Sequence, residues 1–399
     1  MVKITGFRFV RVRGTLDYAG PMFEERLVRP IDIYPEFRAI GASLPVAAGV
    51  NSGAPYQLSQ IFMFIDTDEG VSGMWGPVSE PLIRIILNQF AGIVVGENPQ
   101  AIERLWDKMY RHAIHGRKGD TMMALSAVDI ALWDLKGKLL GAPVYEILGG
   151  PTRESNVAYA SMLGHSIEPE LVRKRCAEVV AQGYGATKWF FRHDPTEGMG
   201  GLRKNVSLVQ TVREAVGPDV EIMFDAWNSW TVPYALQVID QVRQYRPWWI
   251  EEPVMPDMIP QYAELRAAAQ GVAISGGEHE YTRWGIKALL DARAVDVLQP
   301  DPTWAGGLTE MTKIAALASA YGIPLVPHHG GIASLHLIAS QPLMTCPIQE
   351  WLIQHGILSQ ALLDWKIQPV QGRIPLPTAP GLGQALNDDA ITSREELSF

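Results

Sequence analysis

The sequence predicts an α/β barrel that is preceded by a smaller α+β unit. Three observations lead to this fold class. The first third of the chain reads as strands followed by helices, which is typical of an α+β unit. From about residue 156, short apolar strands alternate with amphipathic helices, and the eight strand candidates are enough to close a parallel sheet into a barrel. No Gly-x-Gly-x-x-Gly follows the first of these strands, which disfavours the alternative of an open, doubly wound sheet.

The α+β unit begins with β structure. Apolar and basic residues alternate from Phe7 to Arg13, and the apolar run from Ile61 to Ile65 leads to the turn signal Asp-Glu-Gly at residues 68–70. Residues 15–58 between these strands are rich in Gly, Pro and Ala and predict a long loop, of the kind that often forms a lid. Helices are expected over residues 81–95, 99–113 and 121–140, and Gly141 suits the end of the third.

The alternating part of the chain supplies the barrel. Strands are expected at residues 157–162, 186–191, 221–226, 248–253, 273–278, 295–301, 324–328 and 348–352. The first helix between them places Val172, Cys176 and Val179 on one face and stops at Gly183. Residues 356–399 are rich in loops and are expected to return to the α+β unit.

Composition limits the class of protein. The chain has 399 residues, 47% of them hydrophobic, and a net charge of -9 without any basic run, which argues against a nucleic-acid partner. Its two cysteines, Cys176 and Cys346, argue against a disulfide scaffold and favour a reducing compartment. The N-terminus has no apolar signal segment, and no apolar run approaches the ~20 residues of a membrane-spanning helix. We therefore expect a cytoplasmic protein with no membrane partner.

The candidate site lies at the carboxyl ends of the strands, where the functional groups of α/β barrels are found. The third to eighth strands each bring an ionisable residue to this rim: Asp225, Glu251, Glu278, Asp301, His328 and Glu350. Three neighbouring carboxylates repel one another unless a cation binds between them. Because all three ligands are oxygens, Mg²⁺ is favoured over Zn²⁺.

The other three groups suit proton transfer. A carboxylate at Asp301 would fix the tautomer of His328 and raise its basicity, which makes His328 a candidate base. Glu350, if protonated, could donate a hydrogen bond to a developing oxyanion. A bound cation and a placed base together fit the removal of a proton next to a carboxylate, because the cation neutralises the charge that develops on the carboxylate oxygens.

This arrangement resembles the mandelate racemase subgroup of the enolase superfamily. The resemblance covers nearly the whole chain and includes residues 127–134 (AVDIALWD), 141–145 (GAPVY), 148–150 (LGG) and every strand end named above. It implies a modified (β/α)₇β barrel over residues 136–355, an N-terminal α+β capping domain over residues 1–135, and a C-terminal segment, 356–399, that returns to the cap. It also implies Mg²⁺ ligands at Asp225, Glu251 and Glu278, a His328–Asp301 dyad, and a homo-oligomer, often an octamer.

Within the subgroup, residues 188–192 (KWFFR), 225–227 (DAW) and 277–279 (GEH) are similar to L-rhamnonate dehydratases. The racemases carry Lys-x-Lys on the second strand, whereas this chain has Lys188 followed by Phe190. Phe190 cannot accept a proton, so racemisation, which needs a base on each face, is disfavoured. The remaining expectation is dehydration of an acid sugar, in which His328 removes the α-proton and the β-hydroxyl leaves, to give a 2-keto-3-deoxy acid.

Substrate contacts are less well defined by the sequence. Lys188 is expected to touch the substrate carboxylate or to pair with Glu252 or another nearby acid. Tyr34 and Arg38 in the long loop and His279 at the rim are further candidates, and other polar candidates in the first unit are His112, His115, Arg117 and Lys118.

Three alternatives to the dehydratase remain. A cycloisomerase of a sugar lactone or anhydro-sugar acid would use the same chemistry, and a non-catalytic protein of the same fold would only bind sugar acids. A Zn²⁺ hydrolase is disfavoured by the all-carboxylate ligand set and by the absence of His-x-His on the first strand.

Overall fold

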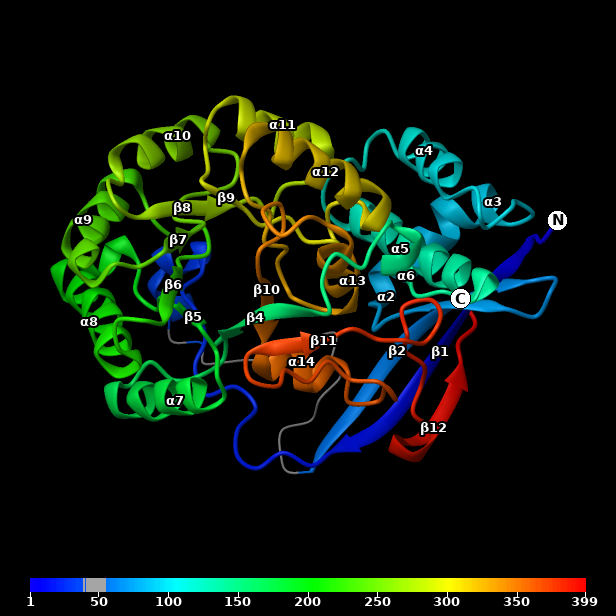
Figure 1. Cartoon of the computed structure of the whole chain (residues 1–399), viewed down its shortest axis with the longest axis horizontal. Coiled ribbons are helices and arrows are strands. Elements are labelled where there is room, and N and C mark those ends of the chain that lie inside the picture. The colour runs from blue at the N-terminus through cyan, green and yellow to red at the C-terminus, as the bar shows by residue number, and fades with distance from the viewer. Residues whose placement is uncertain (39, 41–54) are drawn as a thin grey trace.

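Two β-sheets organise the chain in the computed structural model, which describes residues 1–38, 40 and 55–399. The first is an antiparallel sheet of order β12-β1-β2-β3, at the right of Figure 1. The second is a curled sheet of order β10-β4-β5-β6-β7-β8-β9, with β11 paired to β4. Helices surround the curled sheet, as the left half of Figure 1 shows. The predicted fold class, a modified barrel with an α+β unit, is confirmed.

The antiparallel sheet joins the two ends of the chain. Its strands are β1 (Ile4–Leu16), β2 (Tyr56–Thr67), β3 (Ser72–Trp75) and β12 (Ile391–Glu396), and β12 pairs with β1. The helices that follow β3 are α2 (Glu80–Ile85), η3 (Ile86–Phe90), α3 (Ala91–Val94), α4 (Ile102–His112), α5 (Asp120–Leu140) and α6 (Val144–Ile147). The helix expected over residues 81–95 is therefore interrupted by a π-helical turn, η3.

Most of the parallel strands are shorter than the apolar runs that predict them. They are β4 (Ser155–Ser161), β5 (Ala186–Phe190), β6 (Glu221–Asp225), β7 (Trp249–Glu251), β8 (Ala273–Gly276), β9 (Val297–Leu298) and β10 (Gln349–Leu352). The strand expected at residues 324–328 is only an isolated bridge between Leu325 and Leu298. Pro324 and Pro327 explain this, because proline has no N–H to donate to a sheet. The segment still occupies the strand position, since the Val326 N–H donates to the Leu298 carbonyl.

The helices and short elements around the sheet fill the sequence between these strands. They are α7 (Pro169–Ala181), η4 (Pro195–Glu197), α8 (Gly198–Val216), α9 (Val232–Val242), η5 (Arg243–Tyr245), α10 (Ile259–Ala268), α11 (Thr282–Asp291), α12 (Gly307–Tyr321), α13 (Ile332–Ser340) and α14 (Ile353–Ser359), followed by β11 (Arg373–Pro375) and η6 (Asp388–Ala390). The main apolar core lies between these helices and the outer face of the sheet.

The interior of the barrel is built in two layers. An apolar layer contains Tyr159, Ala186, Met223, Trp249, Val297, Val326 and Ile348. Because side chains alternate along a strand, the residues two positions further on share the same face. They form a polar layer of Ser161, Lys188, Asp225, Glu251, Gln299, His328 and Glu350. The apolar layer thus closes the barrel beneath a ring of polar groups at the carboxyl ends of the strands.

The long loop expected at residues 15–58 contains more structure than predicted. Within it are η1 (Pro30–Ile33) and α1 (Pro35–Arg38), β1 extends to Leu16, and β2 begins at Tyr56. Residues 39 and 41–54 lie outside the described residues. The domain limits at residues 135 and 355 stay predictions, since α5 and α14 each run through one of them. Among the described residues, no helix has the length and apolar character that a membrane crossing requires.

Candidate active site

The three carboxylates predicted to bind metal lie together at the rim of the barrel. Asp225 and Glu251 end the neighbouring strands β6 and β7 and are paired in register. Glu278 lies just beyond β8, in the turn that follows Gly276. One oxygen from each of the three carboxylates lies within 4.8 Å of the others, and all three side chains are buried.

This cluster fits a divalent cation. The Glu278 Oε2 atom is buried and has no hydrogen-bond partner among the described residues. Burial raises the pKa of Glu278 to about 8, and burial together with Glu251 raises the pKa of Asp225 well above its usual range. The cluster therefore does not readily carry its full negative charge without a bound cation. A hard cation that prefers oxygen ligands would stabilise that charge.

The predicted dyad is also brought together. The His328 Nδ1 atom lies 2.8 Å from Asp301 Oδ2, and His328 Nε2 lies 3.6 Å from Glu278 Oε2. Although burial lowers the pKa of His328, Glu278 and Asp301 raise it to about 10. A cation among the carboxylates would counter the effect of Glu278. Since Asp301 holds Nδ1, Nε2 is the nitrogen left to exchange a proton with a substrate.

Lys188 pairs with nearby acids, as the sequence allowed, and these are Glu251 and Glu350 rather than Glu252. Its Nζ atom lies 2.7 Å from Glu251 Oε1 and 2.8 Å from Glu350 Oε1, and the lysine side chain is 1% exposed. Although burial raises the pKa of Glu350, Lys188 and His328 lower it to about 2. Glu350 is therefore a carboxylate in this arrangement, and the protonated donor considered from the sequence does not fit it.

The second face of the site has no base on β5. Phe190 occupies the strand position two residues beyond Lys188, and the Lys188 Nζ atom lies 5.3 Å from the centroid of its ring. His279 lies elsewhere on the rim, with Nδ1 2.7 Å from Glu252 Oε2. The indole of Trp304 packs between His279 and His328, with ring centroids 5.5 and 5.1 Å away.

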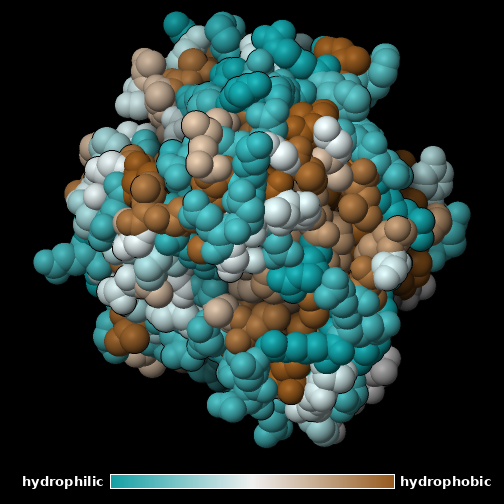
Figure 2. All heavy atoms as spheres, turned by 90° about the vertical axis from the view of Figure 1, so that its right-hand side faces the viewer, coloured by the Kyte–Doolittle hydropathy of each residue, from teal (hydrophilic) through white to brown (hydrophobic). Residues whose placement is uncertain are grey.

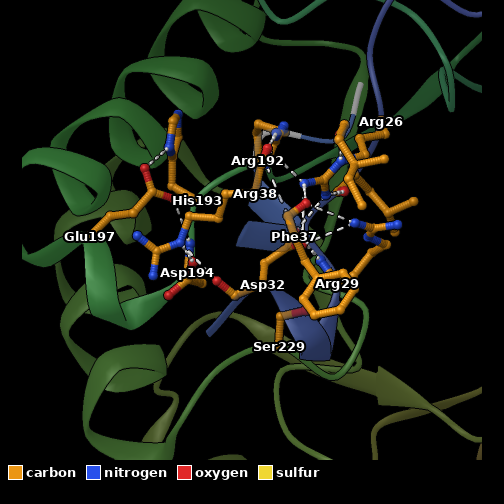
Figure 3. A network of polar contacts seen from close by, with 12 residues as sticks. Arg26, Arg29, Asp32, Phe37, Arg38, Arg192, His193, Asp194, Glu197 and Ser229 are labelled. Atoms are coloured by element: carbon orange, nitrogen blue, oxygen red, sulfur yellow. Dashed lines mark hydrogen bonds and ion pairs between the residues drawn. The ribbon is translucent and has the colours of Figure 1, made fainter. Parts of the chain in front are cut away.

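The loop candidates are placed differently from one another. Figure 3 shows Arg38 in a network of polar contacts in which Asp194 and Asp32 take part. The Arg38 Nε atom lies 3.1 Å from Asp194 Oδ2 and donates to the Asp32 carbonyl, and the guanidinium also contacts Thr196. Arg38 thus joins the loop to the segment after β5. Tyr34, by contrast, is 54% exposed.

The remaining polar candidates of the first unit are His112, His115, Arg117 and Lys118. Lys118 pairs with Glu280, with 2.7 Å between the Nζ and Oε1 atoms, and so joins the segment before α5 to the turn after β8. His112 and His115 are exposed. No contact in the described part of the chain joins these residues to the candidate metal ligands.

Four further residues touch the site and were not predicted. Thr303 donates from its backbone N–H and its hydroxyl to Asp301 Oδ1, at 2.6 and 2.7 Å. Gln299 Nε2 and Trp249 Nε1 both donate to Glu251 Oε2. Trp227 donates to two of the carboxylates. Strand alternation could have identified Gln299, because it lies two residues before Asp301 on the same face of the barrel.

Comparisons with known proteins agree with this geometry. The mandelate racemase / muconate lactonizing enzyme N-terminal domain model matches residues 43–149, and the enolase C-terminal domain-like model matches residues 171–390. An L-rhamnonate dehydratase from Saccharopolyspora erythraea is 35% identical over 381 residues, which are 93% of this chain and 92% of the relative.

Two solved structures are similar over nearly their whole length. Rhamnonate dehydratase from Gibberella zeae complexed with Mg is 29% identical with a TM-score of 0.81, and the match covers 97% of this chain and 95% of that one. The 3,6-anhydro-D-galactonate cycloisomerase from Zobellia galactanivorans is 28% identical with a TM-score of 0.77, over 98% and 100% of the two chains. On these grounds the chain belongs to the mandelate racemase / muconate lactonizing enzyme family within the enolase superfamily.

Proposed function

We propose that this protein is a Mg²⁺-dependent hydro-lyase that dehydrates an acid sugar, with L-rhamnonate-like aldonates as the first substrates to test. The observation that carries the proposal is the pairing of one imidazole base, His328, with a cluster of three buried carboxylates. The likeness to an L-rhamnonate dehydratase over 93% of the chain supports the choice of substrate class.

We assign the metal to Asp225, Glu251 and Glu278. When bound there, Mg²⁺ would neutralise the charge that builds up on the substrate carboxylate as the α-proton leaves. Lys188 lies beside Glu251 and Glu350, close enough to this cluster to add a second positive charge. The two cations would together lower the pKa of the α-proton enough for an imidazole base to remove it.

His328 performs the proton transfers. Its Nε2 atom takes the proton from the α-carbon, while Asp301 holds Nδ1 and stabilises the imidazolium that forms. The same imidazolium can give a proton to the β-hydroxyl, so that the C–O bond breaks and water leaves. The resulting enol then becomes a 2-keto-3-deoxy acid. Phe190, on the other face, allows no second proton abstraction, which is why elimination is proposed instead of racemisation.

The test is a proton NMR experiment in D₂O with Mg²⁺ and a panel of aldonates and aldarates. A substrate should lose its α-proton signal and yield a 2-keto-3-deoxy product, and the His328→Asn variant should not catalyse the change. Exchange of the α-proton without a new product would show that the enolate forms but that the true substrate carries a different leaving group. A panel that shows neither exchange nor product would contradict the acid-sugar proposal.

A second candidate is a cycloisomerase, because the Zobellia galactanivorans enzyme has the same fold at 28% identity. Ring opening of an anhydro-sugar acid would use the same base and metal but expel a ring oxygen. Mass spectrometry of the product separates the two reactions, since dehydration removes the mass of one water molecule and isomerisation leaves the mass unchanged.

We further propose that the protein is a cytoplasmic homo-oligomer. Its two cysteines are buried and unpaired, which suits a reducing compartment. Large apolar side chains such as Met344 and Val370 are exposed, and on the face shown in Figure 2 apolar patches lie between polar ones. Light scattering coupled to size exclusion tests the assembly, for which the family resemblance implies an octamer.

A further inference from the structure

We propose that Trp227 is a positioning residue for the metal site and that its indole N–H sets the affinity for Mg²⁺ by orienting Glu278. The proposal rests on the metal site assigned under the proposed function. Trp227 lies in the turn directly after β6, two residues beyond Asp225.

Trp227 contacts two of the three carboxylates in the cluster. Its backbone N–H donates to Asp225 Oδ1 at 2.8 Å, and its indole Nε1–H donates to Glu278 Oε1 at 3.2 Å. Each bond holds one oxygen of its carboxylate, and Glu278 Oε2 is left without a hydrogen bond among the described residues. Because both donors are neutral, they fix the carboxylates without repelling a cation as an ammonium group would.

The backbone of this turn adopts a strained conformation that places Trp227 for these contacts. Trp227 has φ +40° and Asn228 has φ +61°, in the left-handed region that large side chains rarely adopt. Such a conformation persists only where the surroundings enforce it, and it is concentrated at functional sites. Here the Ala226 and Asn228 N–H groups donate to the carbonyls of Glu251 and Glu252. These bonds turn the Trp227 side chain back across the strand ends, where it packs on His279 with 5.8 Å between ring centroids.

The third carboxylate does not depend on Trp227. Glu251 is held by Lys188 at Oε1 and by Gln299 and Trp249 at Oε2. Removing the indole N–H therefore takes from Glu278 its one side-chain hydrogen bond among the described residues and leaves only the 3.6 Å contacts with His279 and His328, while Glu251 keeps all its donors. Loss of a hydrogen bond that orients a metal-binding side chain commonly weakens metal binding by about 10- to 100-fold.

The experiment measures Mg²⁺ binding to the metal-stripped full chain by calorimetry. Trp227→Phe keeps an aromatic ring on the turn but removes the N–H, and the Kd for Mg²⁺ should rise about 10- to 100-fold. Trp230→Phe is the matched control. It removes an indole N–H that donates to the His193 carbonyl, which Asn205 also contacts, and it should leave the Kd within about twofold of the wild type.

A second replacement covers the case in which Trp227→Phe fails to fold. Incorporation of 3-benzothienylalanine at position 227 keeps the shape of the indole and replaces only the N–H by sulfur, and it should weaken Mg²⁺ binding by a similar factor. Wild-type affinity in either folded replacement overturns the role of Trp227 and leaves the proposed function standing. A wild-type chain that binds no Mg²⁺ overturns the metal site, and with it the proposed function.

Discussion

At the scale of single residues, Lys188 is a buried cation between the carboxylates of Glu251 and Glu350. Lys188→Met keeps most of the side-chain volume but removes the charge, and both carboxylates then stay buried without it. In EDTA we expect the free energy of unfolding, measured with urea, to fall by about 3–5 kcal/mol, as it does when one partner of a buried pair is lost. Lys287→Met breaks an exposed pair with Asp291 and should leave the free energy of unfolding nearly unchanged, because solvent screens that pair. Equal losses in the two variants would contradict the structural role of Lys188.

Thr303 acts at the same scale, through Asp301. Its hydroxyl and N–H fix one oxygen of the carboxylate, so that the other faces His328. Thr303→Val removes the hydroxyl bond, and kcat should fall about tenfold with KM unchanged, in keeping with the loss of one hydrogen bond to a charged group. Thr312→Val removes a hydroxyl that donates within α12 and should leave kcat unaffected. A rise in KM instead of a fall in kcat would show that Thr303 affects binding rather than the dyad.

At the scale of elements, the sequence predicted where strands lie better than how long they are. Apolar runs locate all the parallel strands, but hydrogen bonding ends β8 at Gly276, so Glu278 reaches the cluster from a turn. Arg38 shows the limit for loops, because its carboxylate partner, Asp194, lies 156 residues further along the chain. Trp227 shows the same limit for turns, because nothing in the sequence indicates that a tryptophan adopts a positive φ. The alternation of side chains along a strand predicts which strand residues face the interior of the barrel. Only the folded structure shows which turn residues pack over them.

The helices α5 and α12 meet through Asp129, which offers a test at this scale. Its Oδ2 atom accepts the Thr309 N–H at the start of α12, and burial raises the pKa of Asp129 to about 7. Because this pKa exceeds that of the unfolded chain, its contribution to stability is full below about pH 4 and is lost as the pH rises through 7. Urea unfolding should show that the wild type loses about 3 kcal/mol more than Asp129→Asn between pH 5 and pH 8. The exposed Asp240→Asn should follow the wild type, and a parallel response of all three proteins would exclude a buried, titrating Asp129.

At the scale of the whole molecule, the barrel, the segment after α5 and the C-terminal segment meet at His336. This fully buried side chain lies on α13, accepts the Tyr145 N–H at Nδ1 and faces the Leu382 carbonyl with Nε2. A neutral imidazole with its proton on Nε2 satisfies both partners. Protonation of Nδ1 would break the bond to Tyr145, so the junction of the three segments depends on a neutral histidine.

This junction should weaken in acid. Burial lowers the pKa of His336 to about 4, below the value of about 6.5 in the unfolded chain. The unfolded state then binds the proton more tightly, so the stability contributed by His336 is complete above pH 6.5 and declines as the pH falls towards 4. By pH 5 the wild type should lose about 2 kcal/mol that His336→Gln does not lose, as measured by urea unfolding at pH 7 and pH 5. The exposed His112→Gln should retain the wild-type decline. If His336→Gln declined as steeply as these two proteins, the acid sensitivity would have to arise at other histidines, such as the buried His165 or the half-buried His355, whose pKa values burial also lowers.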